Sequence, residues 1–109
     1  MIIVFSIPDR KNQSISDVQD TISSILAQSV APGQIFAIGD VFNGAYPSIQ
    51  FLSTEKMSYT EAINQAVQQS DDPFILLIDN RTSPVRLNAS AIDILTLTMK
   101  RNPEAAIIY

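Results

Sequence analysis

Short apolar runs alternate along this chain with segments in which apolar residues recur every three or four positions. Runs of four or five residues rich in β-branched and aromatic side chains are typical of strands that are buried on both faces, as in a parallel sheet. We therefore predict strands, the third of them short, at Ile2–Phe5, Ile35–Ile38, Ile49–Leu52, Phe74–Ile78 and Ala105–Tyr109. The run at Phe74–Ile78 is the strongest strand signal in the chain.

The periodic segments between these runs predict three amphipathic helices. Ser16 with Gln19, and Ser58 with Glu61, have the spacing of a capping box at a helix N-terminus. The third helix is expected from about Ser90 to about Lys100. The apolar face of the first helix is formed by Val18, Ile22, Ile25 and Leu26, and that of the second by Ala62, Ile63, Ala66 and Val67. The buried side of the third helix is formed by Ile92, Leu95 and Met99.

This order of strands and helices predicts an α/β fold with a mostly parallel sheet and helices on both faces. The 109 residues fit one domain, residues 1–109, which is large enough to bury a core. Phe5, Phe36 and Phe74 are expected in that core, as large apolar side chains usually are. Tyr46 and Phe51 are less clear, because an aromatic ring near the second strand can also stack on a base.

Aspartates follow three of the predicted strands, at Asp9, Asp40 and Asp79. Because the carboxyl ends of parallel strands lie at one edge of a sheet, these side chains are expected at the same edge, where such folds bind ligands. A carboxylate there can hold a metal ion that bridges phosphates. Aspartate is also common in turns, where it caps backbone amides. The sequence leaves these two interpretations about evenly balanced.

Composition excludes several classes of function. The chain has a net charge of −4 and no clusters of Lys and Arg, so we expect no binding to nucleic acid. It has no cysteine and no histidine, which excludes thiolate chemistry and Ser-His-Asp arrangements. No apolar run is long enough to span a bilayer and no signal peptide is evident, so we expect no membrane insertion and a cytoplasmic location.

Familiar phosphate-binding loops are also absent. The sequence contains neither a GxxxxGK[ST] loop nor a GxGxxG turn, and it has only three glycines. A receiver domain of the two-component type shares the fold class. Such domains carry an acidic pair after the first strand and a lysine after the last strand. This chain has a single acid, Asp9, after its first predicted strand, and no lysine follows its last predicted strand, which ends at Tyr109.

The order of the remaining motifs resembles a known family. A first strand leads into a turn with a proline, a Ser-x-Leu-x-Gln type of pattern follows in the first helix, and an acid ends the second strand. Two further motifs are an Ala-x-Asn pattern in the second helix and an aspartate after the fourth strand. In chain order, the five motifs are Pro8, Ser24-Ile25-Leu26-Ala27-Gln28, Gly39-Asp40, Ala62-Ile63-Asn64 and Ile78-Asp79. Together they resemble the N-terminal half of family 2 glycosyltransferases, which have the GT-A fold.

The resemblance implies a site for a nucleotide-sugar donor. Family members often bind a UDP-sugar, with Mn²⁺ or Mg²⁺ bridging its phosphates. The nucleotide-binding positions that the resemblance implies in this chain are Pro8, Asp9, Arg10, Gly39, Asp40, Lys56 and Asp79. The first three would lie beside the base or ribose, and Lys56 near the phosphates. Asp79 would be the metal ligand, in the last position of the family's Asp-x-Asp type of motif.

The chain departs from the family pattern at two of these positions and at its end. Gly39 stands where the first acid of a pair is expected, and Leu77 and Ile78 stand in the metal motif where other acids would be. The family's acceptor site and general base lie in a following half, so no catalytic residue is carried over. We therefore predict a GT-A-like, Rossmann-like donor-site domain, truncated before the acceptor half, that binds UDP or a UDP-sugar with a divalent cation.

Two alternatives stay open. One is a transferase that becomes competent when a partner chain supplies the acceptor half. The other is a non-enzymatic interaction domain that kept the fold and lost the site. The C-terminal strand favours association into a homo-oligomer, because an unpaired sheet edge invites pairing with another chain.

Overall fold

The part of the chain that the structure describes is built on a four-stranded parallel sheet. A computed structural model describes residues 1–7, 15–29, 32–40, 46–72, 74–80 and 85–102. The strands within these ranges are β1 (Ile2–Ser6), β2 (Gln34–Gly39), β3 (Ile49–Ser53) and β4 (Ile75–Ile78). They lie in the order β3-β2-β1-β4, and each neighbouring pair is parallel. The α/β class and the parallel sheet expected from the sequence are confirmed.

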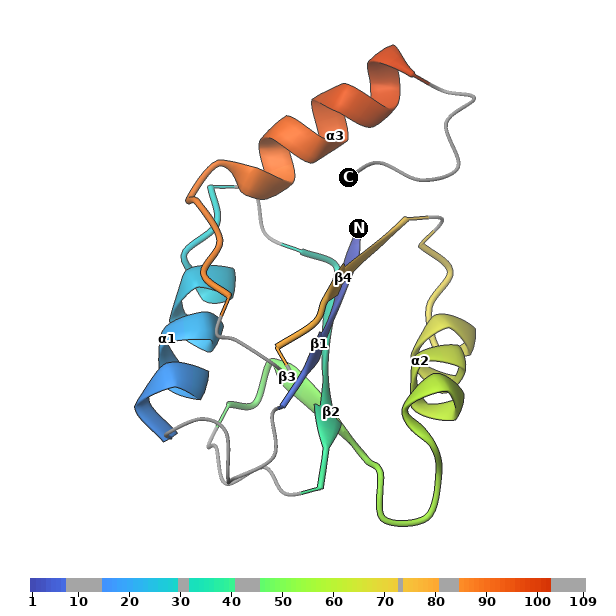
Figure 1. Cartoon of the computed structure of the whole chain (residues 1–109). Coiled ribbons are helices and arrows are strands. Elements are labelled where there is room, and N and C mark those ends of the chain that lie inside the picture. The colour runs from blue at the N-terminus through green and yellow to red at the C-terminus, as the bar shows by residue number, and fades with distance from the viewer. Residues whose placement is uncertain (8–14, 30–31, 41–45, 73, 81–84, 103–109) are drawn as a thin grey trace.

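Helices cover both faces of this sheet. The three helices are α1 (Ile15–Leu26), α2 (Tyr59–Gln68) and α3 (Ala91–Arg101). Helix α1 lies on one face and α2 on the other, while α3 extends across the end of the sheet where β1 begins (Figure 1). One core cluster joins alternate residues of β1, including Ile3 and Phe5, to α1 and to Ile92 of α3. The other joins Ile2, Val4 and β2 to α2.

The helix boundaries test the predicted caps. Ser58 is the N-cap of α2, and its hydroxyl accepts a hydrogen bond from the Glu61 backbone N–H at 3.1 Å, as predicted. Ser90 occupies the N-cap position of α3. Helix α1 already begins at Ile15, so Ser16 lies within its first turn and the predicted cap at that residue is wrong. None of these helices, within the part of the chain that the structure describes, is long and apolar enough to cross a bilayer.

The strongest predicted strand is not a core strand. Among the described strands, β4 lies at an edge of the sheet, where Leu77 is 49% exposed and Ile75 is 40% exposed. Phe74, just before the strand, is 45% exposed, so its predicted place in the core is wrong. Helix α2 has its main strand contacts with β2 and β3. Val67 of α2, which was expected on the buried face, is also exposed.

An ion pair fastens the first strand to the segment before β4. The amino group of Met1 donates a hydrogen bond to Asp72 Oδ2 and forms a salt bridge with it. Asp72 also accepts a hydrogen bond from the Phe74 backbone N–H at 3.1 Å. The hydrogen bond from the Met1 ammonium group, aided by the bond from Phe74, lowers the pKa of the Asp72 carboxyl below its usual value of 3.8, although partial burial opposes this shift.

Loss of this carboxylate is expected to make the domain less stable and to alter its pH dependence. Because the folded pKa of Asp72 is depressed, its contribution is fully present well above pH 3.8 and is lost as the pH falls through 3.8 toward the folded pKa. Asp72→Asn should therefore lower the free energy of unfolding by about 1–2 kcal/mol at pH 7. Urea titrations at pH 7 and pH 3 measure both effects. The exposed neighbour provides the control: Asp71→Asn should change little, and an equal loss in both variants would contradict the assignment.

Candidate functional site

The strand order reverses between β1 and β4. From β1 the chain passes through α1 to β2 on one side, and from β3 it returns through α2 to β4 on the other side. In open α/β sheets, ligands bind outside the carboxyl ends of the strands at such a switch point. At this place Ser6 ends β1, while Asp79 and Asn80 directly follow β4.

A polar cluster at this switch point joins the two strands. The Ser6 hydroxyl accepts a hydrogen bond from the Asn80 backbone N–H at 2.7 Å. The same hydroxyl donates to Asp79 Oδ1 at 3.4 Å. Ser6 is only 1% exposed, whereas Asp79 is exposed to solvent. The sequence therefore places an exposed carboxylate at the switch point, and a buried hydroxyl lies directly beneath it.

Asn80 connects this cluster to α1 and to the segment after β4. Its side chain is fully buried; the amide nitrogen donates to Thr21 Oγ1 at 3.2 Å and the amide oxygen accepts from the Val85 backbone N–H at 2.8 Å. Thr21 in turn donates to the Val85 carbonyl oxygen at 2.7 Å. Sequence analysis did not single out Asn80, because its neighbours come from distant parts of the chain.

Two further side chains, those of Ser24 in α1 and Gln28 just after its end, hold the segment that follows Val85. The Ser24 hydroxyl accepts a hydrogen bond from the Leu87 N–H at 3.0 Å. Gln28 donates to the Asn88 carbonyl at 2.8 Å and accepts from the Ile92 N–H at 3.1 Å. Ser24 and Gln28 are the ends of the motif quoted above for its resemblance to glycosyltransferases. In this structure both side chains bind backbone groups.

Gly39 has a structural reason to lack the acidic side chain that the family pattern carries. It is buried at the end of β2, and a Cβ atom added there would lie 2.8 Å from the Cβ of Ile7. A side chain at this position therefore requires the chain after β1 to move.

Asp40, directly after β2, contacts Thr54, directly after β3, at the carboxyl ends of the strands. Its Oδ1 accepts a hydrogen bond from Thr54 Oγ1 at 2.7 Å, and the Thr54 N–H donates to the Gly39 carbonyl at 3.0 Å. The carboxylate thus joins the ends of β2 and β3 through a side chain fourteen residues away, and this contact is not the capping of a neighbouring backbone amide that the turn interpretation describes.

The remaining predicted site residues are spread along the edge. Exposed Lys56 comes three residues after β3, the strand farthest from β4, and the ends of these two strands are about 14 Å apart at a strand spacing of about 4.8 Å. It shares the carboxyl edge with Asp79 but is not beside it. Pro8, Asp9 and Arg10, and the predicted strand at Ala105–Tyr109, lie outside the described residues.

The donor groups limit what kind of metal site this edge can form. Asp40 and Asp79 follow strands that are two positions apart in the sheet, with β1 between them, and each carboxylate accepts a hydrogen bond from a different hydroxyl, that of Thr54 for Asp40 and that of Ser6 for Asp79. Among the described residues, no group of three or more acidic side chains is arranged to hold a metal ion. One exposed carboxylate fits Mg²⁺ or Mn²⁺ only where phosphate oxygens and water supply the other ligands, as Mg²⁺ sites often do.

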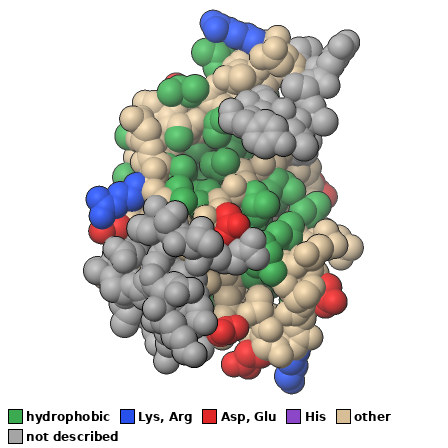
Figure 2. Space-filling model, viewed as in Figure 1, with side chains coloured by type: hydrophobic (Ala, Val, Ile, Leu, Met, Phe, Trp, Pro, Cys, Tyr) green, Lys and Arg blue, Asp and Glu red, His purple; other side chains and the backbone are tan. Residues whose placement is uncertain are grey.

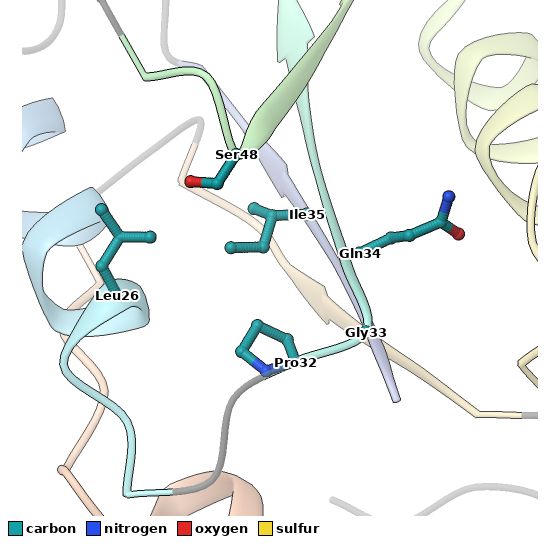
Figure 3. A pocket seen from close by; sticks show the side chains of 6 residues that line it. All are labelled: Leu26, Pro32, Gly33, Gln34, Ile35 and Ser48. Carbon is teal, nitrogen blue, oxygen red and sulfur yellow. The ribbon is translucent and has the colours of Figure 1, made fainter.

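A shallow hollow of about 210 Å³ lies at the other end of the strands from this polar cluster. Leu26, Pro32, Ile35 and Ser48 point toward one another around it, while Gln34 points away (Figure 3). Gln34 begins β2 and Ser48 precedes β3, so the hollow is at the amino ends of the strands. It is smaller than the usual 300–1,000 Å³ of small-molecule pockets, and its side chains carry no charge.

Comparison of the sequence with models of protein families and with curated proteins finds no match. The assignment of a function therefore depends on the site itself.

Proposed function

We propose that this domain binds a nucleoside diphosphate or a nucleotide-sugar, UDP or a UDP-sugar, together with Mn²⁺ or Mg²⁺. The observation that carries the proposal is the exposed Asp79 carboxylate at the switch point of a parallel sheet, next to Ser6 of β1. Ligands bind at this place in open α/β sheets, and carboxylate oxygens are the ligands that these hard cations prefer. The ordered resemblance to the donor half of family 2 glycosyltransferases supports the choice of nucleotide.

The two described aspartates, Asp79 and Asp40, have different roles in this proposal. Asp79 contributes one oxygen ligand to the cation, and the diphosphate completes the coordination. Asp40 is bound to Thr54, so its part would be to hold the ends of β2 and β3 together beside the base. The cation would supply neutralisation of the diphosphate charge. No residue of the described chain is assigned as a general base, and sugar transfer is not part of the function proposed for the domain alone.

Removal of the Asp79 carboxylate is expected to weaken cation-dependent binding. Asp79→Ala should weaken UDP binding in the presence of Mn²⁺ by about tenfold or more, since a charged group that contacts a ligand contributes about 1.5–3 kcal/mol. Isothermal titration calorimetry with UDP, with and without Mn²⁺, measures this effect. Asp93→Ala removes the same charge from the exposed start of α3 and serves as the control. If Asp79→Ala binds as tightly as the parent protein, Asp79 is not the metal ligand.

A second candidate function, an interaction domain that associates with another copy, is favoured by the surface of β4. Hydrophobic side chains gather at the centre of the face shown in Figure 2, where β4 lies in Figure 1. The exposed side chains of β4 and of the residue before it include Phe74, Ile75 and Leu77. An edge strand with exposed apolar residues invites pairing with a second strand.

Charge introduced on this surface is expected to prevent such association. In the interaction model, Leu77→Lys should reduce the mass measured by light scattering at high protein concentration to that of the monomer, because a buried lysine would be unpaired in the interface. Val67→Lys, on α2, is the matched control. A parent protein that remains a monomer at every concentration would exclude this candidate. A cytoplasmic location, without a nucleic-acid partner, belongs to both candidates and agrees with the net charge of −4.

A further inference from the structure

The buried serine beneath Asp79 has no role in the function proposed so far. Ser6 is the last residue of β1, and its hydroxyl contacts both residues that follow β4. A hydroxyl carries one proton and two acceptor lone pairs. Because the Asn80 N–H binds to the oxygen at 2.7 Å, one lone pair is engaged and the proton is directed toward the Asp79 carboxylate.

We infer that Ser6 is a positioning residue for Asp79 in the binding of a nucleoside diphosphate with its cation. The inference rests on the proposed function and adds to it a residue that selects one orientation of the carboxylate. The Ser6 hydroxyl favours the Asp79 rotamers that bring Oδ1 toward it. Holding one of them reduces the ordering that binding requires, which raises affinity.

The surrounding cluster gives Ser6 the rigidity that this role needs. Ser6 is held by the strand pairing of β1 with both of its neighbours, and Asn80 is held through Thr21 and Val85. The 3.4 Å separation between the Ser6 hydroxyl and Asp79 Oδ1 is longer than the usual O–H···O distance. The contribution of the contact to affinity is therefore expected to be moderate.

Three variants separate positioning from simple stability. Ser6→Ala removes the hydroxyl, Thr21→Val removes a hydroxyl from the same buried cluster but away from Asp79, and Ser6→Thr keeps the hydroxyl while adding a methyl group. All three should unfold at lower urea concentration than the parent. For UDP with Mn²⁺, Ser6→Ala should bind about fivefold more weakly, as expected for one lost hydrogen bond. Thr21→Val and Ser6→Thr should bind as the parent does.

Combination with Asp79→Ala completes the test. If Ser6 acts through Asp79, adding Ser6→Ala to Asp79→Ala should cause no further loss of affinity, whereas independent effects would add. Affinity that follows stability across the three variants, or equal affinity of Ser6→Ala and the parent, would overturn the role of Ser6 and leave the proposed function intact. A parent protein that binds no nucleotide would overturn both.

Discussion

Replacing Gly39 with alanine is expected to destabilise the domain by about 1–3 kcal/mol, the range for overpacking a close contact. The new Cβ would lie 2.8 Å from the Cβ of Ile7, and the backbone there is fixed because the Ile7 N–H donates to the Ile38 carbonyl at 2.7 Å. Gly39→Asp, which restores the acid of the family pattern, should cost about 3 kcal/mol or more, because it adds a charge to a buried position.

Urea unfolding at neutral pH measures both changes at Gly39. Gly33→Ala is the matched control, because its Cβ would be 3.5 Å from the nearest side-chain atom, Asp72 Oδ2, which is an ordinary contact. That variant should stay within about 0.5 kcal/mol of the parent. A Gly39→Asp protein as stable as the parent would show that the chain after β1 adapts readily, and the steric reason for the missing acid would be wrong.

Replacing Asn80 with alanine is expected to lower the free energy of unfolding by about 2–4 kcal/mol. The substitution leaves the Val85 N–H and the Thr21 hydroxyl without the partner that Asn80 provides, and each lost partner of a buried polar group costs about 1–3 kcal/mol. It also removes packing from a side chain that is completely buried. Since the Asn80 side chain joins α1 to the segment after β4, the loss should reach both, whereas the hydrogen bond from the Asn80 backbone N–H to Ser6 is kept.

Hydrogen exchange locates this effect as well as measuring it. Asn80→Ala should speed exchange at the Val85 and Leu87 amides, since both bind side chains of this junction. Asn64→Ala, at an exposed position of α2, removes the same amide group and should leave the stability almost unchanged. Equal stability of the two variants would mean that the junction contributes little to the fold.

Much of the fold could be predicted because its signals are local. Apolar runs such as Ile2–Phe5 and caps such as Ser58 depend on neighbouring residues, and the structure confirms both elements. The exposure of Phe74 could not be predicted in the same way. The run Phe74–Ile78 is as apolar as a central strand, and its place at an edge depends on the order of the strands, which no local pattern encodes.

The candidate site was predictable in outline only. Sequence alone indicated that Asp40 and Asp79 share an edge of the sheet, because each follows a parallel strand. It did not show that β1 lies between their strands or that each carboxylate has its own hydroxyl partner. The contacts of Ser6 with Asp79 and Asn80 join residues more than seventy positions apart along the chain, and the Asn80 side chain contacts Thr21, 59 positions away. No spacing rule identifies such pairs.

The central claim, that a nucleotide binds at the carboxyl edge between β1 and β4, is tested most directly by NMR. Amide resonances of the ¹⁵N-labelled protein would be followed during titration with UDP and Mg²⁺, a diamagnetic cation. The account predicts that the largest shifts occur at Ser6, Ile7, Asp79 and Asn80. Shifts confined to the opposite edge, around Gly33 and Ser48, or no shifts at a large excess of UDP, would contradict it.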